Sequence, residues 1–241
     1  KIVDHIADIN LTYSDISREY LLNEGLAPDK IIKTGSPMKE VIDYYMPKIK
    51  KSKILNFLKL KSNNFYLVSF HREENVESND NFLKGIEIIN FIAESYKKRV
   101  ILSAHPRTKK RIDLFKIKLN KNVKVIKPLC FTDYNKLQIN AKAVLSDSGT
   151  ITEESSIMNF PALNIRETHE RPEGMEEGSV MLVGLSLNKV MQSLDILNSQ
   201  GSGDSRDLNI VRDYNVVNVS DKVLRIINSY TDYVNSYTWK K

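Results

Sequence analysis

The feature that most constrains the fold is a repeated alternation between short apolar runs and longer stretches with helical periodicity. Apolar runs typical of buried strands begin at Phe65, Val100, Val123, Ala143 and Ala162. Amphipathic patterns separate them, for example the apolar positions from Phe82 to Ile92, which recur at helical spacing. Such alternation predicts an α/β protein with a Rossmann-like, doubly wound parallel sheet covered by helices on both faces. Ligands of such sheets bind beyond the carboxyl ends of the strands.

One of these alternations, Ala143–Glu154, has the pattern of an anion site. It predicts a short strand, a tight turn at Ser148-Gly149 and a helix that opens at Thr150. The first N–H groups of a helix point outward and carry partial positive charge, which suits a phosphate or diphosphate. Ser148 can add a hydroxyl donor, and Gly149 allows a ligand close to the backbone. The structural alternative is an ordinary β–α turn with a serine cap.

Other polar side chains follow the predicted strands. His71 lies in the loop His71-Arg72-Glu73-Glu74-Asn75, His105 follows the next strand, and Arg171 lies in the predicted loop Arg166–Ser179. Together with Ser148 they could line one cleft. His71 is either a phosphate donor or a loop histidine satisfied by the backbone, and His105 is better explained as structural. Arg171 suits bidentate contact with a phosphate, although a plain salt bridge would also explain it.

Two further side chains have a binding interpretation beside a structural one. Glu154 could accept hydrogen bonds from a ribose diol, or it could favour the first helical turn through the helix dipole alone. Tyr134 could stack on a base, although an aromatic in the first turn of a helix is more often part of the core. The Gly/Ser-rich loop Ser199–Arg206 contains G-x-G without a preceding strand, so it does not predict a dinucleotide site.

Composition narrows the possible partners. The net charge is +6, spread over the chain, and no motif typical of nucleic-acid binding appears. No apolar run is long enough for a membrane span. Cys130 is the single cysteine, which excludes an internal disulfide or a cysteine metal cluster and fits a reducing cytoplasm. The chain opens in mid-pattern at Lys1 without an initiator methionine, so we expect a missing N-terminal part.

Three motifs together resemble one family. They are His71-Arg72-Glu73-Glu74-Asn75, then Ser146-Asp147-Ser148-Gly149-Thr150 with Glu153-Glu154, and finally Glu170-Arg171-Pro172-Glu173. Their spacing is similar to that of the non-hydrolysing UDP-N-acetylglucosamine 2-epimerases, and the resemblance covers nearly the whole chain. HPRTKKRI, KPLCFTDYNKLQ and YTDYVNSYTWKK resemble the branch that makes UDP-N-acetyl-L-fucosamine from a 6-deoxy sugar.

This resemblance implies two Rossmann-like domains of GT-B type, with UDP held by the C-terminal one. It assigns diphosphate contacts to His71, Ser148 and Gly149, a basic nucleotide-site role to Arg171, and the ribose to Glu154. Tyr134 falls where an aromatic ring packs on uracil. Arg72 and Thr150 belong to the same two motifs and are counted among the substrate-binding residues, whereas Leu129 stands where some members have a polar glutamine.

The reaction that the resemblance implies needs no cofactor or metal. The C1–O bond to UDP breaks as the C2 proton leaves, a glycal forms, and UDP adds back after protonation on the opposite face. Two acid/base groups are needed. His71 is a catalytic candidate in this chain, while the family's carboxylates would belong to a missing N-terminal domain of about 100–150 residues. We therefore expect UDP binding without turnover by this chain alone, and a homodimer when the enzyme is complete.

The expected organisation has three parts. Residues 1–36 would be the end of the N-terminal domain, 37–219 the UDP-binding domain, and 220–241 a helix that crosses back, with Trp239 against Lys1–Pro37. Three other functions remain open. A glycosyltransferase of the same architecture should show a glutamate pair where Pro161 and Ala162 stand, a hydrolysing epimerase would release free sugar, and a UDP-sugar sensor would only bind.

Overall fold

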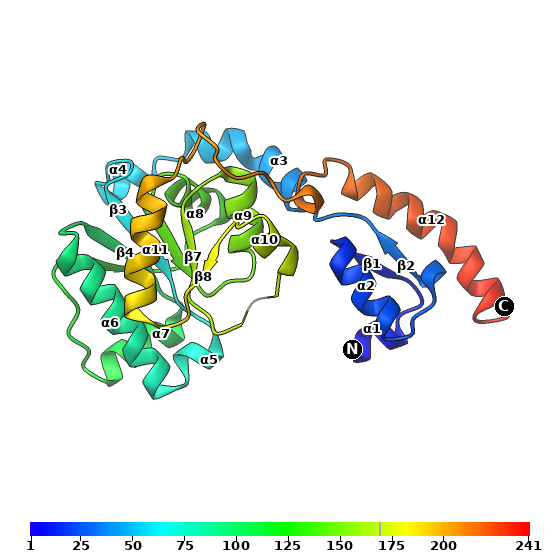
Figure 1. Ribbon diagram of the computed structural model, residues 1–241, viewed down its shortest axis with the longest axis horizontal. Coiled ribbons are helices and arrows are strands. Elements are labelled where there is room, and N and C mark those ends of the chain that lie inside the picture. Colours follow the sequence, from blue (N-terminus) through cyan, green and yellow to red (C-terminus); the bar gives the residue numbers. More distant parts are fainter. Residues whose placement is uncertain (169) are drawn as a thin grey trace. The chain divides into compact units, whose positions relative to one another are not determined.

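The computed structural model describes residues 1–168 and 170–241, and the chain divides into two compact units (Figure 1). Unit 1 consists of Lys1–Tyr44 and Ile210–Lys241, and unit 2 of Tyr45–Asn209. Residues 37–44 and 210–219, which were predicted from the sequence to belong to the UDP-binding domain, thus belong to unit 1. Whether unit 1 is the end of a larger Rossmann-like domain stays a prediction.

Unit 2 is an α/β layer structure, which confirms the predicted fold class. Its six strands are all parallel, in the order β5-β4-β3-β6-β7-β8. They are β3 (Phe65–Ser69), β4 (Arg99–Ser103), β5 (Val123–Ile126), β6 (Ala143–Ser146), β7 (Ala162–Asn164) and β8 (Met181–Leu182). The helices are α4 (Ile54–Leu58), α5 (Glu73–Val76), α6 (Asn79–Ser95), α7 (Pro106–Leu114), α8 (Phe131–Gln138), α9 (Ile151–Met158), α10 (Pro172–Glu176) and α11 (Leu187–Ser199). Helix α3 (Met38–Lys51) contains the border between the units.

The strand order reverses between β3 and β6. From β3 the chain moves outward through β4 to β5, then returns to the other side of β3 and moves through β6 to β7 and β8. Val68 pairs with Leu145 and Ser69 with Ser146, so both strands end at the same level. At such a reversal the two following loops part and leave a crevice, which is where open parallel sheets bind ligands.

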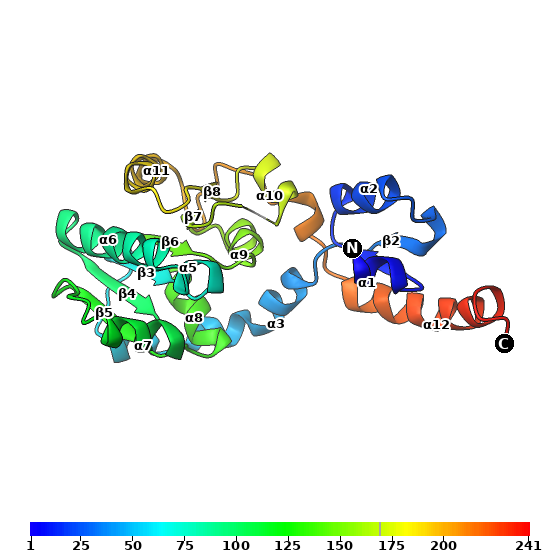
Figure 2. The same cartoon turned by 90° about the horizontal axis from the view of Figure 1, so that it is seen from below.

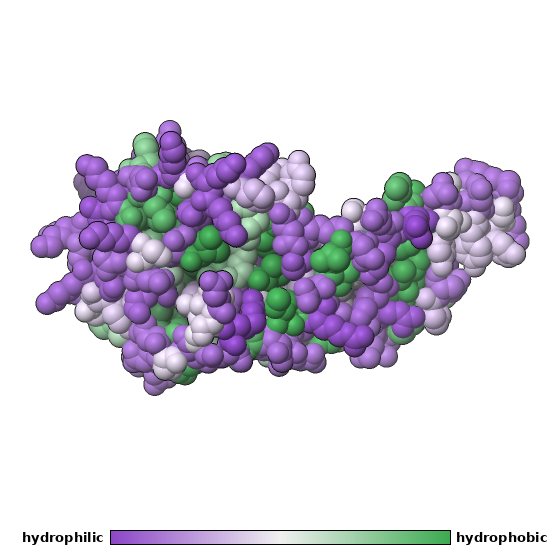
Figure 3. All heavy atoms as spheres, turned by 90° about the horizontal axis from the view of Figure 1, so that it is seen from above, coloured by the Kyte–Doolittle hydropathy of each residue, from purple (hydrophilic) through white to green (hydrophobic). Residues whose placement is uncertain are grey.

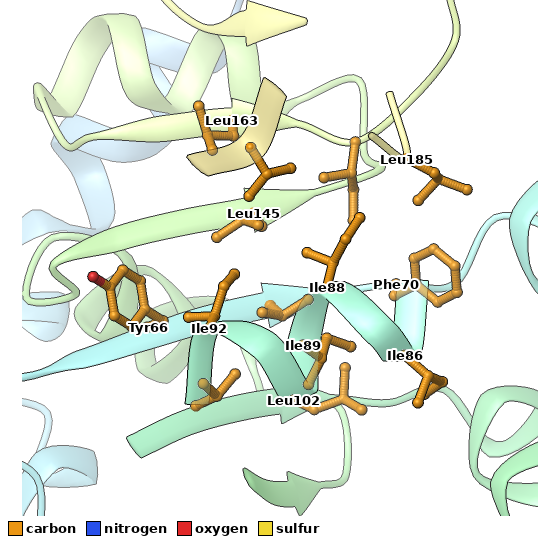
Figure 4. Close-up of a cluster of buried hydrophobic side chains, with 14 of the residues drawn as sticks. Tyr66, Phe70, Ile86, Ile88, Ile89, Ile92, Leu102, Leu145, Leu163 and Leu185 are labelled. Carbon is orange, nitrogen blue, oxygen red and sulfur yellow. The ribbon is translucent and has the colours of Figure 1, made fainter. Parts of the chain in front are cut away.

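Alternation along the strands gives the sheet two apolar faces. Tyr66 and Val68 of β3 point to a cluster that includes α6 and α11, whereas Phe65 and Leu67 point to a second cluster that includes α4 and α8. Figure 2 shows α11 and α8 on opposite sides of the sheet. Figure 4 shows the first cluster, in which Ile88, Ile89 and Ile92 of α6 lie among Tyr66, Leu102 and Leu145 of the strands. Both faces are therefore covered.

Three local predictions for unit 2 are corrected by the structure. The predicted loop Arg166–Ser179 contains α10, which starts at Pro172, a residue that suits the first position of a helix. The polar loop after β3 becomes helical at Glu73, where α5 begins. After His105 the sequence also predicts a basic helix that reaches about Leu119, but α7 ends at Leu114, because Lys116 adopts φ 49°, a left-handed conformation that stops a helix.

Unit 1 combines the two ends of the chain. Its helices are α1 (Ile2–Ile6), α2 (Asp15–Asn23) and α12 (Val219–Tyr237), with short 3-10 turns at Pro28–Lys30 and Arg212–Tyr214. Strands β1 (Asn10–Thr12) and β2 (Ile31–Lys33) form a parallel pair. Helix α12 contacts this pair's flanks, since Tyr233 donates to Asp29 at 3.1 Å and Trp239 donates to Asp8 at 3.3 Å. Two paired strands are marginally stable alone.

The surface of unit 1 exposes several large apolar side chains. Ile2 is 79% exposed, Ile6 76%, Tyr237 72% and Trp239 56%. Trp239 reaches a residue before Met38, as expected, but its ring is not buried. In the space-filling view apolar patches interrupt a mainly hydrophilic surface (Figure 3). None of the described helices is long and apolar enough to cross a membrane.

Candidate functional site

The strand reversal between β3 and β6 is held together by one buried carboxylate, Asp147, which follows β6 directly. Its Oδ2 accepts the backbone N–H of His71 at 2.9 Å and that of Arg72 at 2.8 Å. The side chain of Asn75 donates to the same oxygen at 3.3 Å. Asp147 is fully buried. It therefore fixes the loop after β3 against the loop after β6, and this brings the two predicted motifs together.

Asp147 also orients the His71 ring. His71 Nδ1 lies 3.1 Å from Asp147 Oδ1 and 3.2 Å from Ser69 Oγ. The hydrogen bond to Asp147 raises the pKa of His71. Burial alone would raise the pKa of Asp147, but the His71 ring and the two backbone N–H groups together lower it. With Nδ1 turned to the carboxylate, Nε2 is left for a ligand, and 43% of the side chain is exposed.

The turn Ser148–Thr150, called here the anion-binding turn, lies beside this histidine. Ser148 Oγ and Thr150 Oγ1 are 3.0 Å apart, and α9 begins at Ile151. In the described part of the chain, no backbone carbonyl accepts the N–H of Gly149 or Thr150. A Cβ added at Gly149 would lie 3.1 Å from Glu170 Oε2 and 3.8 Å from Arg72 Nη2. The Arg72 guanidinium and the N–H groups of the turn are the donors that a phosphate site requires, and a carboxylate of the chain lies beside them.

A short polar chain continues from the turn toward α8. Glu154, on α9, accepts a 2.5 Å hydrogen bond from Gln138. Glu154 is only 8% exposed, and this burial raises its pKa. Burial also raises the pKa of the Tyr134 hydroxyl, with the charge of Glu154 adding to the effect. Tyr134 and Glu154 thus lie on one side of the anion-binding turn.

Arg171 contacts a protein carboxylate. Its Nε and Nη2 both lie 3.1 Å from Glu153 Oε2, and Glu153 is 2% exposed. This is the salt bridge that the sequence left open as an alternative. Glu153 is the neighbour of Glu154 on α9, so Arg171 contacts the residue next to the proposed ribose ligand. Its direct contact with a nucleotide stays a prediction.

Three groups at this edge were given no role of their own from the sequence. They are Asp147, the buried Arg166 after β7, and Glu170, which contacts Arg72 and Arg166. Arg166 is 4% exposed and also contacts Glu74 at 3.1 Å. A charged residue directly after an apolar strand was the available signal for Asp147 and Arg166. His105 accepts the N–H of Arg107 and caps α7, in agreement with a structural role.

A concavity of about 290 Å³ lies at the amino ends of β7 and β8 and is lined by residues such as Ser155, Phe160 and Arg206. Arg206 uses its guanidinium to bond the carbonyls of Ser156 and Ile157 at the end of α9. This concavity lies away from the strand reversal. Within residues 1–168 and 170–241, no three His, Cys, Asp or Glu side chains are grouped so as to hold a metal ion.

Comparisons with known proteins agree with this geometry. The family described as UDP-N-acetylglucosamine 2-epimerase matches residues 1–228. A UDP-N-acetylglucosamine 2-epimerase of Methanocaldococcus jannaschii is 32% identical over 206 residues, which is 81% of this chain and 56% of that protein.

Solved structures extend the likeness to the whole chain. That of the Rickettsia bellii UDP-N-acetylglucosamine 2-epimerase matches with a TM-score of 0.92 and 43% identity, over all of this chain and 64% of that one. The M. jannaschii enzyme in complex with UDP-GlcNAc and UDP matches with a TM-score of 0.85 and 29% identity, over 95% and 63%. The chain therefore spans somewhat more than half the length of these relatives.

Proposed function

Because the chain belongs to the UDP-N-acetylglucosamine 2-epimerase family, we propose that unit 2 binds the UDP part of a UDP-2-acetamido sugar and that the complete enzyme epimerises C2. The observation that carries the proposal is the convergence of His71, Arg72 and the anion-binding turn at the strand reversal. A relative with 29% identity was solved with UDP-GlcNAc and UDP, which supports the choice of ligand.

The proposed reaction eliminates UDP and adds it back through a glycal. As the C1–O bond breaks, negative charge develops on the diphosphate. Arg72 and the N–H groups of Gly149 and Thr150 stabilise this charge where it forms. Protonated His71, whose pKa is raised by Asp147, donates from Nε2 to the leaving phosphate oxygen. These groups are in place before the ligand arrives, so little reorganisation is needed.

The remaining nucleotide contacts follow from the same edge of the sheet. Glu154 accepts from the ribose hydroxyls, held by Gln138. Tyr134 packs on the uracil ring, and Ser148 donates its hydroxyl to the diphosphate. Arg171, paired with Glu153, supplies positive charge next to the ribose contact.

We assign the C2 proton transfers to carboxylates outside these 241 residues. They would belong to an N-terminal domain, on the same polypeptide or on a separate one. We propose that the 241-residue chain binds UDP and does not epimerise alone. We propose further that the complete enzyme is a cytoplasmic homodimer, with the single cysteine fitting a reducing compartment. The motifs HPRTKKRI and KPLCFTDYNKLQ favour a 6-deoxy UDP-sugar, the precursor of UDP-N-acetyl-L-fucosamine, as substrate.

Calorimetric titration of the chain with UDP tests the binding part of the proposal. His71→Ala and Arg72→Ala should each weaken UDP by about tenfold or more, because each removes a charge-assisted hydrogen bond. Lys109→Ala, which removes an exposed charge on α7, is the control and should leave the affinity nearly unchanged. Equal effects in all three variants would place UDP elsewhere.

Proton NMR of UDP-N-acetylglucosamine, and of its 6-deoxy analogues, incubated with the chain tests the catalytic part. No change in the C2 configuration is expected from this chain alone. Turnover by the pure chain would show that the acid/base groups lie within these 241 residues, against the proposal.

A further inference from the structure

The carboxylate of Glu170 lies over the anion-binding turn. Its Oε1 is 3.2 Å from Arg72 Nη1 and its Oε2 is 3.3 Å from Arg72 Nη2, so the arginine donates to the carboxylate in a bidentate manner. Glu170 Oε1 is also 3.1 Å from Nη2 of Arg166. A Cβ added at Gly149 would lie only 3.1 Å from Glu170 Oε2. A negative group of this chain thus lies at the N-terminal end of α9.

We propose that Glu170 is an internal counter-anion that competes with the incoming diphosphate for Arg72 and for the anion-binding turn, and so sets the affinity of the site. The inference rests on the proposed function, since it needs a diphosphate to bind at Gly149. Arg72 cannot present its bidentate fork to a carboxylate and a phosphate together. The space next to Gly149 likewise cannot hold both groups.

The surroundings allow this exchange without exposing a bare charge. The side chain of Glu170 is 47% exposed, so the released carboxylate moves into water. Arg166 is 4% exposed and keeps its 3.1 Å contact with Glu74 when Glu170 leaves. Its Nη1 is buried and lacks a hydrogen-bond partner among the described residues. Arg166 therefore stays in place through its contact with Glu74.

Charge supports the same exchange. Arg166 and then Arg72 hold the pKa of Glu170 below its usual range, so the carboxylate is ionised at neutral pH. A diphosphate carries more negative charge than one carboxylate and takes more hydrogen bonds from the same donors. It therefore displaces Glu170, but the affinity for UDP is reduced by the free energy of the pair it breaks.

Glu170→Gln tests the inference, because glutamine keeps the shape and removes the charge. Calorimetry should show UDP binding tighter than in the unaltered chain by about three- to tenfold, the range expected for a partly exposed bidentate pair. Uridine has no phosphate, so its affinity should stay the same. Glu176→Gln, which removes an exposed carboxylate from α10, is the matched control and should change neither affinity.

The outcomes separate the inference from the proposed function. If Glu170→Gln binds UDP no more tightly than Glu176→Gln does, while His71→Ala still weakens UDP, the counter-anion idea is wrong and the site stands. Weaker binding in Glu170→Gln would instead make Glu170 a positioning residue for Arg72, which also overturns the inference. If neither the unaltered chain nor Glu170→Gln binds UDP, the proposed function fails and the inference with it.

Discussion

Replacing Asp147 by asparagine should destabilise unit 2 by about 2 kcal/mol near neutral pH. The carboxylate accepts two short backbone hydrogen bonds, at 2.9 and 2.8 Å, from His71 and Arg72. A hydrogen bond to a charged group contributes about 1.5–3 kcal/mol and a neutral one about 0.5–1.5 kcal/mol, so each bond loses roughly 1 kcal/mol. Asparagine can keep one acceptor in place, which limits the loss to the charge.

The stability difference between Asp147→Asn and the unaltered chain should depend on pH, in the direction set by the pKa shifts of Asp147 and His71. The folded-state pKa of Asp147 is lowered, so its contribution is present above the reference value of 3.8 and is lost as pH falls through the lower folded pKa. The folded-state pKa of His71 is raised, so its part of the ion pair is present below the reference value of 6.5 and is lost as pH rises through the raised value. The stability difference should be largest between these limits.

Urea unfolding followed by circular dichroism, at several pH values, measures this difference. Ser148→Ala is a suitable control, since it removes a hydroxyl at the same turn that pairs only with Thr150 among the described side chains. Equal stability of Asp147→Asn and the unaltered chain would show that Asp147 does not hold the two loops together. A difference that grows above neutral pH would refute the assigned ion pair with His71.

Three further changes separate binding from stability. Glu154→Gln should leave the free energy of unfolding unchanged or raise it slightly, since burial already raises the pKa of this carboxyl. The binding free energy of UDP should weaken by about 1 kcal/mol. Urea unfolding measures the first effect and calorimetry the second. Arg171→Ala should cost about 3 kcal/mol of stability by removing the ion pair of the buried Glu153 carboxylate, and the double variant with Glu153→Gln should regain most of it in the same unfolding assay. Gly85→Ala should cost about 1–3 kcal/mol in thermal unfolding, because its Cβ would lie 2.6 Å from the buried Phe70 ring, whereas Lys84→Ala on the same helix should be nearly neutral.

The fold and the main binding turn were predictable because their signals are local. Four or five apolar residues followed by a glycine turn and a helical pattern indicated β6 and α9, and the structure places them at Ala143–Ser146 and Ile151–Met158. The apolar run predicted to begin at Phe65 is β3, Phe65–Ser69. Strand order was not stated, because it depends on which strands pair, and no single run of residues encodes that.

Partners distant in sequence could not be predicted. Asp147 bonds Arg72, 75 positions away, and Glu170 pairs with the same arginine, 98 positions away. For Arg171 the sequence offered two outcomes, a phosphate or a carboxylate, and the structure shows the carboxylate of Glu153. A short helix was also missed. The loop predicted after β7 contains α10, because Pro172 and Glu173 favour a first helical turn.

The charges at the strand reversal balance one another before any ligand binds. Arg72 and Arg166 face Glu170 and Glu74, and His71 faces Asp147. Of these carboxylates, Asp147 is fully buried and bound to backbone N–H groups, so it cannot leave, whereas Glu170 is half exposed and holds only side chains. In the proposed exchange an arriving diphosphate therefore takes the place of Glu170 on Arg72, and the groups that position His71 stay fixed. A site built this way stores its donors in the orientation that the leaving diphosphate needs, which is the condition for electrostatic stabilisation without reorganisation during the reaction.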